Sequence, residues 1–503
     1  MSSQATESIR IAELMQQSGV KFGTSGARGL AVDMTDRVCY AYTLAFVRYL
    51  METGDIKAGD QVAVAGDYRP SSPRIMTAAA IAVRDAGCEP FNGGFIPSPA
   101  IALYGIAHGY ASLMVTGSHI PDDRNGIKFN KPSGEILKQD EQAISASTVE
   151  IPAGLFDESS MAQSPAPIPP EDPSAYRAYV QRYLDFFPAD CLKGFKVGVY
   201  QHSSVARDAL AEIFAGLGAE VVALGHSDTF IPVDTEAVRP EDVQLAKHWA
   251  SEQYFDCIIS ADGDGDRPLV SDESGNWLRG DVAGILCAHY LGANAVATPV
   301  SSNSALEKSG WFSRIDRTRI GSPFVIAAME QALADGMDKV VGYEANGGFL
   351  IASDVTMGGN TLAALPTRDA AIVPLAVLML AKQQGVSVSN LLKQLPPRFT
   401  SSDRLKEFPT ELSQVRIAGF NSGDFDQDKQ AIEAVFGQFG QFGQVKSLDS
   451  TDGLRITFDS EEVVHLRPSG NAPELRCYNE ADSAARAAEM NAICMAIMNG
   501  WRE

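Results

Sequence analysis

Cysteine is scarce in this chain and follows no pairing pattern. The seven cysteines are scattered, their number is odd, and no two of them are separated by two residues. Disulfide frameworks and zinc sites both depend on paired spacings, so neither is predicted. We interpret the cysteines as small buried thiols of a protein from a reducing compartment; they stand at Cys39, Cys88, Cys191, Cys257, Cys287, Cys477 and Cys494.

Basic residues are also in short supply. The chain has 41 Lys and Arg against 63 Asp and Glu, which gives a formal net charge of −22. Nucleic acids and anionic membranes both favour clustered Lys and Arg, so we expect no nucleic acid and no membrane as a partner. A small anionic substrate stays possible if basic residues converge on one cleft.

Long hydrophobic runs are missing. The first residues, MSSQATESIRIAEL, lack the apolar core of a signal peptide. The longest apolar run, residues 370–381, contains Pro374 and falls short of the roughly 20 residues that cross a bilayer. A hydrophobic content of 45% is ample for packed globular domains. We therefore expect a soluble, cytoplasmic protein.

The pattern of strands and helices predicts several α/β domains. A chain of 503 residues exceeds what one core supports, so two to four domains are expected. Short β-branched strands alternate with Ala- and Leu-rich amphipathic stretches. Three of these strands lead into Ser-containing turns and then helical patterns: 62–65, 197–200 and 295–300. Three others lead, in the same order, into polar loops with glycine: 113–115, 257–259 and 339–341.

We predict three α/β domains of similar plan, at about 1–156, 171–280 and 281–396. Ordinary α/β alternation would also produce this repeated order of strands and loops. A Pro- and Ser-rich connector covers 157–173, and a Pro-Pro pair at 396–397 marks another boundary. The strand-like segment 454–458 and a closing helix from about Ser483 to Trp501 then predict a smaller α+β domain, 397–503. Ligands gather at the carboxyl ends of strands in open α/β sheets, which directs attention to the three polar loops.

The first loop carries a candidate nucleophile, Ser118. It reads Thr-Gly-Ser-His-Ile-Pro over 116–121, with Lys128 further on. A serine at the end of a buried strand, beside His119, suits a nucleophile or phosphate carrier, although an ordinary Ser-His turn would look the same. No GxSxG elbow surrounds the serine, so a hydrolase triad is poorly supported.

The second loop, Asp-Gly-Asp-Gly-Asp-Arg at 262–267, predicts a metal site. Alternate carboxylates can point at one cation, and oxygen ligands favour Mg²⁺ or Ca²⁺ over zinc. An EF-hand is an alternative because Glu273 falls at the twelfth position, but the sixth is Arg267 instead of glycine and Pro268 follows. A solvated acidic turn is another. Arg267 would set a fixed cation beside the metal, which suits a transferring phosphoryl group.

Three further segments are weaker indications of a functional site when each is taken alone. The loop 342–348 offers Glu344 and Asn346 for bonding to sugar hydroxyls, or is a plain Asn-Gly turn. The segment 467–476 has two arginines, a serine and a glycine, which suit a phosphate-binding site. The alternative is a basic turn without a binding role. Residues 23–29, Gly-Thr-Ser-Gly-Ala-Arg-Gly, resemble a phosphate loop but lack the Walker ending, which speaks against an NTPase.

Together these loops resemble those of the α-D-phosphohexomutases, which include phosphomannomutases, phosphoglucomutases and phosphoglucosamine mutases. The resemblance covers essentially the whole chain, and the serine and Asp-rich loops are highly specific in combination. It implies an α/β protein of four domains around a central cleft, three of them similar and the C-terminal one α+β and like the TATA-binding protein. It also implies Mg²⁺ and a hexose 1,6-bisphosphate intermediate.

The family's functional residues fall on matching positions of this sequence. The resemblance implies a phosphoserine at Ser118, whose phosphoryl oxygen completes a metal site made by Asp262, Asp264 and Asp266. It places Arg28, His119, Lys128 and Arg267 around the transferring phosphoryl group. It gives sugar recognition to Glu344 and Asn346, and binding of the distal phosphate to Arg467, Ser469, Gly470, Asn471 and Arg476.

The sugar loop departs from the pattern of many bacterial members, Glu-x-Ser-Gly-His. Here Asn346 and Gly348 stand where those members have serine and histidine. Asn-Gly-Gly forms also occur in the family, so activity is not threatened but the sugar is harder to assign. The phosphate loop, Gly-Asn-Ala-Pro at 470–473, looks like a phosphomannomutase variant.

We therefore expect a mutase, a monomer or weak homodimer, that interconverts mannose 6-phosphate and mannose 1-phosphate. Glucose phosphates, alone or together with mannose phosphates, are the next substrates, and glucosamine phosphates come after them. Two other classes of protein remain as alternatives: a Mg²⁺-dependent sugar phosphatase, and a sugar-phosphate-binding protein without catalytic activity.

Overall fold

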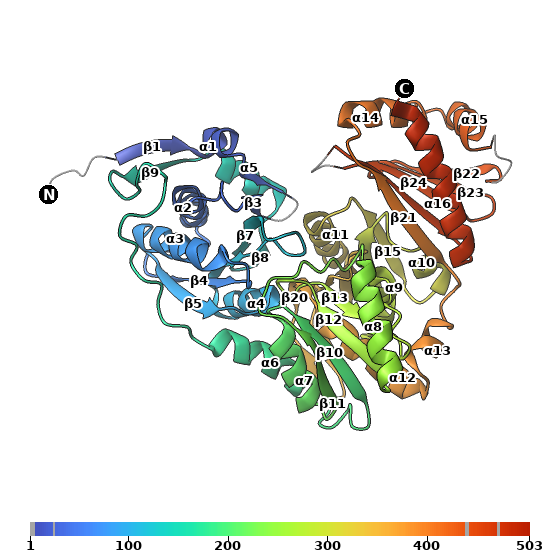
Figure 1. The fold of residues 1–503 in the computed structure, drawn as a ribbon, viewed down its shortest axis with the longest axis horizontal. Helices are drawn as coiled ribbons and strands as arrows, with labels where there is room; N and C mark the ends of the chain where they lie inside the picture. Colours follow the sequence, from blue (N-terminus) through green and yellow to red (C-terminus); the bar gives the residue numbers. More distant parts are fainter. Residues whose placement is uncertain (1–5, 24–25, 438–441, 470–472, 503) are drawn as a thin grey trace. The chain divides into compact units, whose positions relative to one another are not determined.

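The computed structural model describes residues 6–23, 26–437, 442–469 and 473–502. The chain divides into two compact units, residues 1–293 with 321–389, and residues 294–320 with 390–503. Figure 1 labels the helices and strands. Within the described part of the chain, no helix combines the length and apolar character that a membrane crossing requires.

The first unit begins with a seven-stranded mixed sheet. Its order is β2-β3-β7-β6-β4-β5, with β8 added beside β7. The central strands β4 and β6 are almost wholly buried apolar runs, as strands covered on both faces should be, and they pair in parallel. The strands are β2 (Lys21–Phe22), β3 (Ala27–Leu30), β4 (Gln61–Gly66), β5 (Glu89–Gly94), β6 (Ala111–Val115), β7 (Arg124–Lys131) and β8 (Gly134–Glu135).

Helices pack with this sheet in one hydrophobic core. The longest begins where the Thr35 side chain accepts a hydrogen bond from the amide of Val38 and ends at Gly54, whose φ of 81° closes the last turn. The helices are α1 (Ile11–Ser18), α2 (Asp36–Thr53), α3 (Ser72–Asp85), α4 (Ser98–His108) and α5 (Lys138–Ala146); β1 (Thr6–Arg10) pairs with β9 (Thr148–Pro152).

A four-stranded sheet follows in the same unit, in the order β11-β10-β12-β13. The strand β12 is completely buried and ends at the Asp-rich loop. The elements are α6 (Ser174–Phe186), β10 (Lys196–His202), α7 (Arg207–Gly216), β11 (Glu220–His226), α8 (Pro240–Glu252), β12 (Cys257–Ala261) and β13 (Pro268–Val270).

The rest of this unit is built on three antiparallel strands, β16, β17 and β20. The apolar run at 370–381 lies in α12, where Pro374 occupies the first turn, a position that needs no amide donor. The elements are α9 (Gly280–Tyr290), α11 (Ser322–Ala334), β16 (Val340–Tyr343), β17 (Phe349–Ile351), β18 (Val355–Met357), β19 (Asn360–Leu362), β20 (Leu365–Asp369) and α12 (Ile372–Gln384). The short helix α13 (Val388–Leu392) leads out of it.

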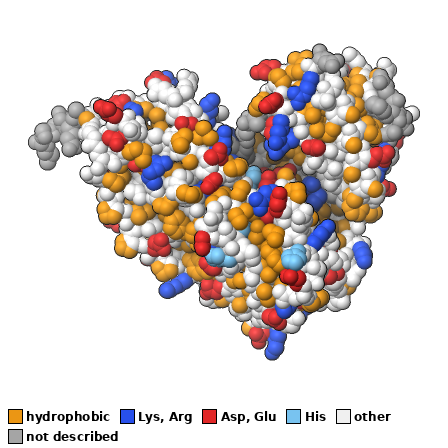
Figure 2. Space-filling model, viewed as in Figure 1, with side chains coloured by type: hydrophobic (Ala, Val, Ile, Leu, Met, Phe, Trp, Pro, Cys, Tyr) orange, Lys and Arg blue, Asp and Glu red, His pale blue; other side chains and the backbone are white. Residues whose placement is uncertain are grey.

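The second unit contains an antiparallel sheet of order β21-β25-β24-β23-β22 with its own core. It also holds the parallel pair β14 and β15. The elements are β14 (Ala295–Pro299), α10 (Ala305–Ser309), β15 (Arg314–Thr318), β21 (Phe399–Leu405), α14 (Thr410–Ala418), α15 (Phe425–Phe436), β22 (Val445–Asp449), β23 (Leu454–Phe458), β24 (Val463–Pro468), β25 (Leu475–Ala481) and α16 (Ala484–Asn499). On the face drawn in Figure 2, acidic and basic side chains are interspersed instead of gathered by sign.

Candidate active site

The serine loop begins where β6 ends and runs from Thr116 to Arg124, the first residue of β7. Ser118 is fully buried and has a φ of 58°, a left-handed backbone conformation that few non-glycine residues adopt. Its amide donates to the Thr116 hydroxyl at 2.7 Å. Such strained positions persist only where the surroundings hold them.

Arg69 holds this loop from the neighbouring turn. Its side chain is fully buried and pairs with Asp67 at 3.0 Å. Its guanidinium donates to four backbone carbonyls of the serine loop, those of Ser118, Ile120, Pro121 and Arg124. A Cβ on Gly117 would lie 2.6 Å from the Arg69 guanidinium carbon, so only glycine allows this approach.

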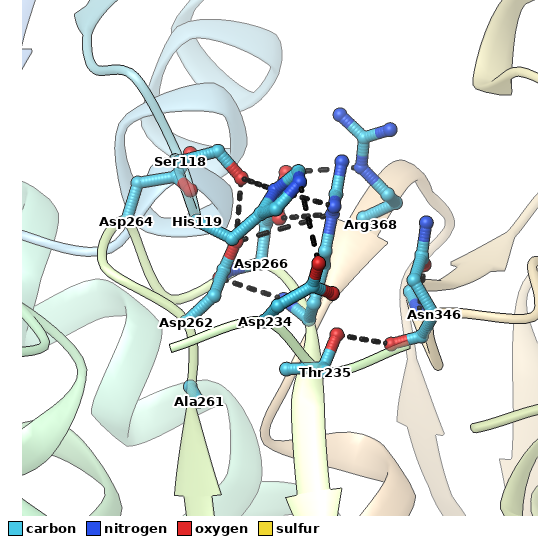
Figure 3. Close-up of polar contacts among 12 residues, drawn as sticks. Ser118, His119, Asp234, Thr235, Ala261, Asp262, Asp264, Asp266, Asn346 and Arg368 are labelled. Carbon is cyan, nitrogen blue, oxygen red and sulfur yellow. Dashed lines mark hydrogen bonds and ion pairs between the residues drawn. The ribbon is translucent and has the colours of Figure 1, made fainter. Parts of the chain in front are cut away.

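The three carboxylates of the Asp-rich loop converge, as Figure 3 shows. Asp262, Asp264 and Asp266 are buried, and one ligand oxygen from each lies within 4.8 Å of the others. One oxygen of Asp264 and one of Asp266 are buried without any hydrogen-bond partner among the described residues. Buried unpaired oxygens on a set of hard donors fit a divalent cation such as Mg²⁺.

The EF-hand alternative does not hold. Glu273, which would be the twelfth ligand, accepts hydrogen bonds from the amide and hydroxyl of Ser389. A fully buried strand, β12, precedes the loop where an EF-hand has a helix.

The Asp-rich and serine loops meet directly. The Ser118 hydroxyl donates to Asp262 at 2.6 Å, and a Cβ on Gly263 would lie 2.7 Å from the Ser118 carbonyl oxygen. The Ser204 hydroxyl, from the turn after β10, donates to the Asp262 carbonyl at 2.7 Å and fixes the start of the Asp-rich loop. The structure thus brings the predicted nucleophile to the predicted metal ligands.

Basic side chains surround the carboxylates. The Lys128 ammonium, on β7, lies 2.6 Å from Asp264 and 2.5 Å from Asp266. Burial opposes its charge, but the two carboxylates outweigh that effect and raise the pKa of Lys128. Arg267 lies 3.9 Å from Asp262 and 3.7 Å from Asp266.

His119 is held as a neutral ring. Burial and the neighbouring Arg267 lower the pKa of His119 to about 3. Arg267 donates to its Nδ1 at 2.8 Å, so the proton of the neutral ring is on Nε2, which lies 3.9 Å from Asp234. Burial and the charge of Arg267 also lower the pKa of Arg28, on β3, to about 10.

The carboxylates differ in their proton affinity. Burial, followed by the charges of Asp264 and Asp266, raises the pKa of Asp262 well above its usual range. Burial also acts on Asp266, but Arg368 and Lys128 outweigh it and hold its pKa well below that range. Of these two carboxylates, Asp266 is therefore the more strongly ionised.

The third loop is the turn between β16 and β17. The strand predicted at 339–341 is observed as β16 over Val340–Tyr343, so Gly342 and Tyr343 belong to the strand and not to the loop as predicted. The Glu344 carboxylate receives a hydrogen bond from Arg368 at 3.1 Å. The Asn346 side chain accepts from the Gly348 amide at 2.9 Å, and its carbonyl accepts from Thr235 at 2.6 Å.

The predicted phosphate loop lies in the second unit. Arg467 on β24 and Arg476 on β25 are register partners, which places their side chains on one face of the sheet. Arg467 pairs with Asp452 at 3.0 Å and Arg476 with Glu474 at 3.2 Å. Ser469 is buried. Gly470 and Asn471 lie outside the described residues.

Three residues of the site were not predicted. Arg69 was visible only as part of a turn, Asp234 stands in a loop without a motif, and Arg368 is a lone charge in the strand β20. The signal available for Arg368 was a charge at the end of a buried strand.

Comparison with known protein families identifies the chain. Four family models match it: phosphoglucomutase/phosphomannomutase alpha/beta/alpha domain I at 19–153, domain II at 175–275, domain III at 279–399 and the C-terminal domain at 423–496. The chain belongs to the phosphoglucomutase/phosphomannomutase family. It therefore has the four-domain phosphohexomutase architecture that the sequence predicted.

Curated relatives and solved structures agree with this. A phosphomannomutase of Salmonella muenchen is 44% identical over 94% of both chains. One of Sinorhizobium fredii is 44% identical over 96% of this chain and 99% of its own length. The crystal structure of a putative phosphomannomutase from Thermus thermophilus has a TM-score of 0.72 at 18% identity, covering 95% of this chain and 99% of its own; at that identity it supports the fold alone.

Proposed function

We propose that this protein is a phosphomannomutase that interconverts mannose 6-phosphate and mannose 1-phosphate through a phosphorylated Ser118. One observation carries the proposal: the Ser118 hydroxyl lies 2.6 Å from Asp262, within a group of buried carboxylates and cations. The 44% identity to two curated phosphomannomutases favours mannose over glucose and glucosamine phosphates.

Asp262, Asp264 and Asp266 would hold Mg²⁺, together with an oxygen of phosphorylated Ser118. The unpaired buried oxygens of Asp264 and Asp266 support this assignment. When bound, Mg²⁺ would offset the charge of the transferring phosphoryl group.

The chain's own residues account for the remaining chemistry. As the sugar hydroxyl attacks, the bond from phosphorus to the Ser118 oxygen breaks, and the proton of the hydroxyl ends on that oxygen. Lys128, Arg28 and Arg267 are cations that stabilise the three phosphoryl oxygens. Because His119 is neutral, it does not repel these three cations. Its ring is held beside Ser118 by Arg267.

The hexose 1,6-bisphosphate formed in this step reorients, and its other phosphate returns to Ser118. Glu344 and Asn346 would bind sugar hydroxyls in both orientations. Arg467, Ser469, Gly470, Asn471 and Arg476 would bind the phosphate that is not being transferred. The shared face of Arg467 and Arg476 supports that role.

The proposal includes four domains, at residues 1–156, 171–280, 281–396 and 397–503. It also includes a cytoplasmic location and a monomer or weak homodimer. The limit between 280 and 281 falls in the first turn of α9, so the helix would start the third domain.

Substrate profiling tests the proposal. Mannose, glucose and glucosamine phosphates are supplied to the full-length protein with Mg²⁺ and a trace of hexose 1,6-bisphosphate, and isomer formation is followed by coupled assays. We expect turnover of mannose phosphates, and its absence in Ser118→Ala. No mannose turnover would refute the substrate, and an active Ser118→Ala variant would refute the mechanism.

The same assay separates the other classes. Release of inorganic phosphate in place of the second isomer would indicate a phosphatase. The absence of phosphoserine at residue 118 in mass spectrometry, even after treatment with hexose 1,6-bisphosphate, would indicate a sugar-phosphate-binding protein without catalytic activity.

A further inference from the structure

Arg368 is a buried cation that joins two predicted parts of the site. It is 2% exposed and stands near the end of β20. Its Nε donates to Asp266 at 2.9 Å, and its Nη1 donates to Glu344 at 3.1 Å. One guanidinium therefore connects a candidate metal ligand with the sugar loop, and Figure 3 shows it directed toward the Asp266 side.

Arg368 takes up space that the sugar loop leaves open. A Cβ on Gly348 would lie 2.4 Å from Cδ of Arg368 and 2.7 Å from its Cγ. Gly348 stands where many bacterial members of the family have histidine. In this chain the Arg368 stem fills the space into which a side chain at 348 would project, so glycine at 348 and arginine at 368 depend on each other.

The third nitrogen of Arg368 is not used within the protein. Its Nη2 is buried and has no hydrogen-bond partner among the described residues. Buried N–H groups nearly always find an acceptor. This N–H lies on the same guanidinium that holds Asp266 and Glu344, so it is available to an oxygen of a ligand bound between the metal and sugar loops.

We propose that Arg368 is a substrate-binding and positioning residue, which binds an oxygen of the hexose phosphate through Nη2 and holds Glu344 in position through Nη1. The inference rests on the proposed function, because it needs a hexose phosphate in this site. Lysine cannot replace it, because a single ammonium has no planar fork to reach both carboxylates and a substrate.

Kinetics of Arg368→Lys and Arg368→Met test the inference. We expect kcat/KM for mannose 6-phosphate to fall about tenfold or more in the lysine variant and about 100-fold or more in the methionine variant, since charge-assisted hydrogen bonds are lost. Arg74→Lys is the control, because Arg74 pairs with Asp36 and donates to the carbonyls of Ala31 and Met34, none of which belongs to the predicted site. It should keep wild-type kinetics.

A double-mutant cycle with Glu344→Gln separates positioning from a general loss of stability. If Arg368 acts through Glu344, the Gln substitution will cost several-fold less in the Arg368→Met background than in the wild type. Independent, multiplying effects would overturn the positioning role. Unchanged kcat/KM in Arg368→Met would overturn the inference altogether.

Calorimetric binding of mannose 6-phosphate to the wild type and to Arg368→Met distinguishes the two levels of the argument. If the wild type turns over mannose phosphates and both proteins bind equally well, the inference fails and the proposed function stands. If the wild type shows neither turnover nor binding, both fail.

Discussion

Replacing Arg69 by methionine should loosen the serine loop. Arg69 is fully buried, pairs with Asp67 and donates to four loop carbonyls. Breaking a buried ion pair by removing one partner costs about 3–5 kcal/mol. The orphaned carbonyls add to this cost unless water enters to satisfy them. We therefore expect a local destabilisation of about 3 kcal/mol or more.

Hydrogen–deuterium exchange of a peptide covering residues 116–129 measures this change. A loss of about 3 kcal/mol corresponds to roughly 150-fold faster exchange. Local exchange is the right observable, because a chain of several domains has no single free energy of unfolding. Turnover should fall as well, since the loop fixes Ser118 in its left-handed conformation.

The double variant Asp67→Asn/Arg69→Met is the control for charge. It removes both partners of the ion pair, so it should exchange more slowly than Arg69→Met alone. Exchange within threefold of the wild type in Arg69→Met would refute the reasoning. A double variant that exchanges faster than Arg69→Met would also refute it.

Three further predictions follow from packing and protonation. Gly280→Ala should lower kcat/KM about tenfold or more, because its Cβ would lie 2.1 Å from the amide nitrogen of Gly347 in the sugar loop; unchanged kinetics would contradict it. Thr35→Ala should destabilise α2 by about 1 kcal/mol through loss of the bond from Val38, measured as faster hydrogen–deuterium exchange of a peptide covering α2, with Thr35→Ser as control. Burial lowers the pKa of His202 from 6.5 to about 4, so its contribution to stability is complete above pH 6.5 and falls by on the order of 3 kcal/mol toward pH 4. A His202→Gln variant should lose that acid dependence, measured by hydrogen–deuterium exchange of a peptide covering β10 and corrected for the intrinsic pH dependence of exchange; an identical pH profile would disprove the assignment.

Much of the fold could be read from the sequence because buried strands leave a continuous apolar signal. The strand at 454–458 is β23 with the same limits. The closing helix runs from Ala484 to Asn499, close to the predicted range, because Ser483 caps its start. The end of β16 was missed because Gly342 and Tyr343 resemble loop residues, yet Tyr343 is fully buried.

The site was predictable where residues follow each other along the chain. The three aspartates alternate in one loop, so local spacing alone brings them together. Arg368 and Arg69 act through contacts that join distant segments, and no local pattern marks such contacts. A single charged residue at a strand end is common, and only the fold shows that Arg368 reaches both Asp266 and Glu344.

The two halves of the serine loop differ in how well they tolerate a new side chain. Gly117 cannot accept even a methyl group beside Arg69, whereas Asp122 and Asp123 are exposed only a few positions later. All seven native cysteines are buried. An Asp122→Cys substitution therefore offers the one thiol open to a fluorescent label among them, on the same loop as Ser118, and loading of that serine could be followed in real time without disturbing its neighbours.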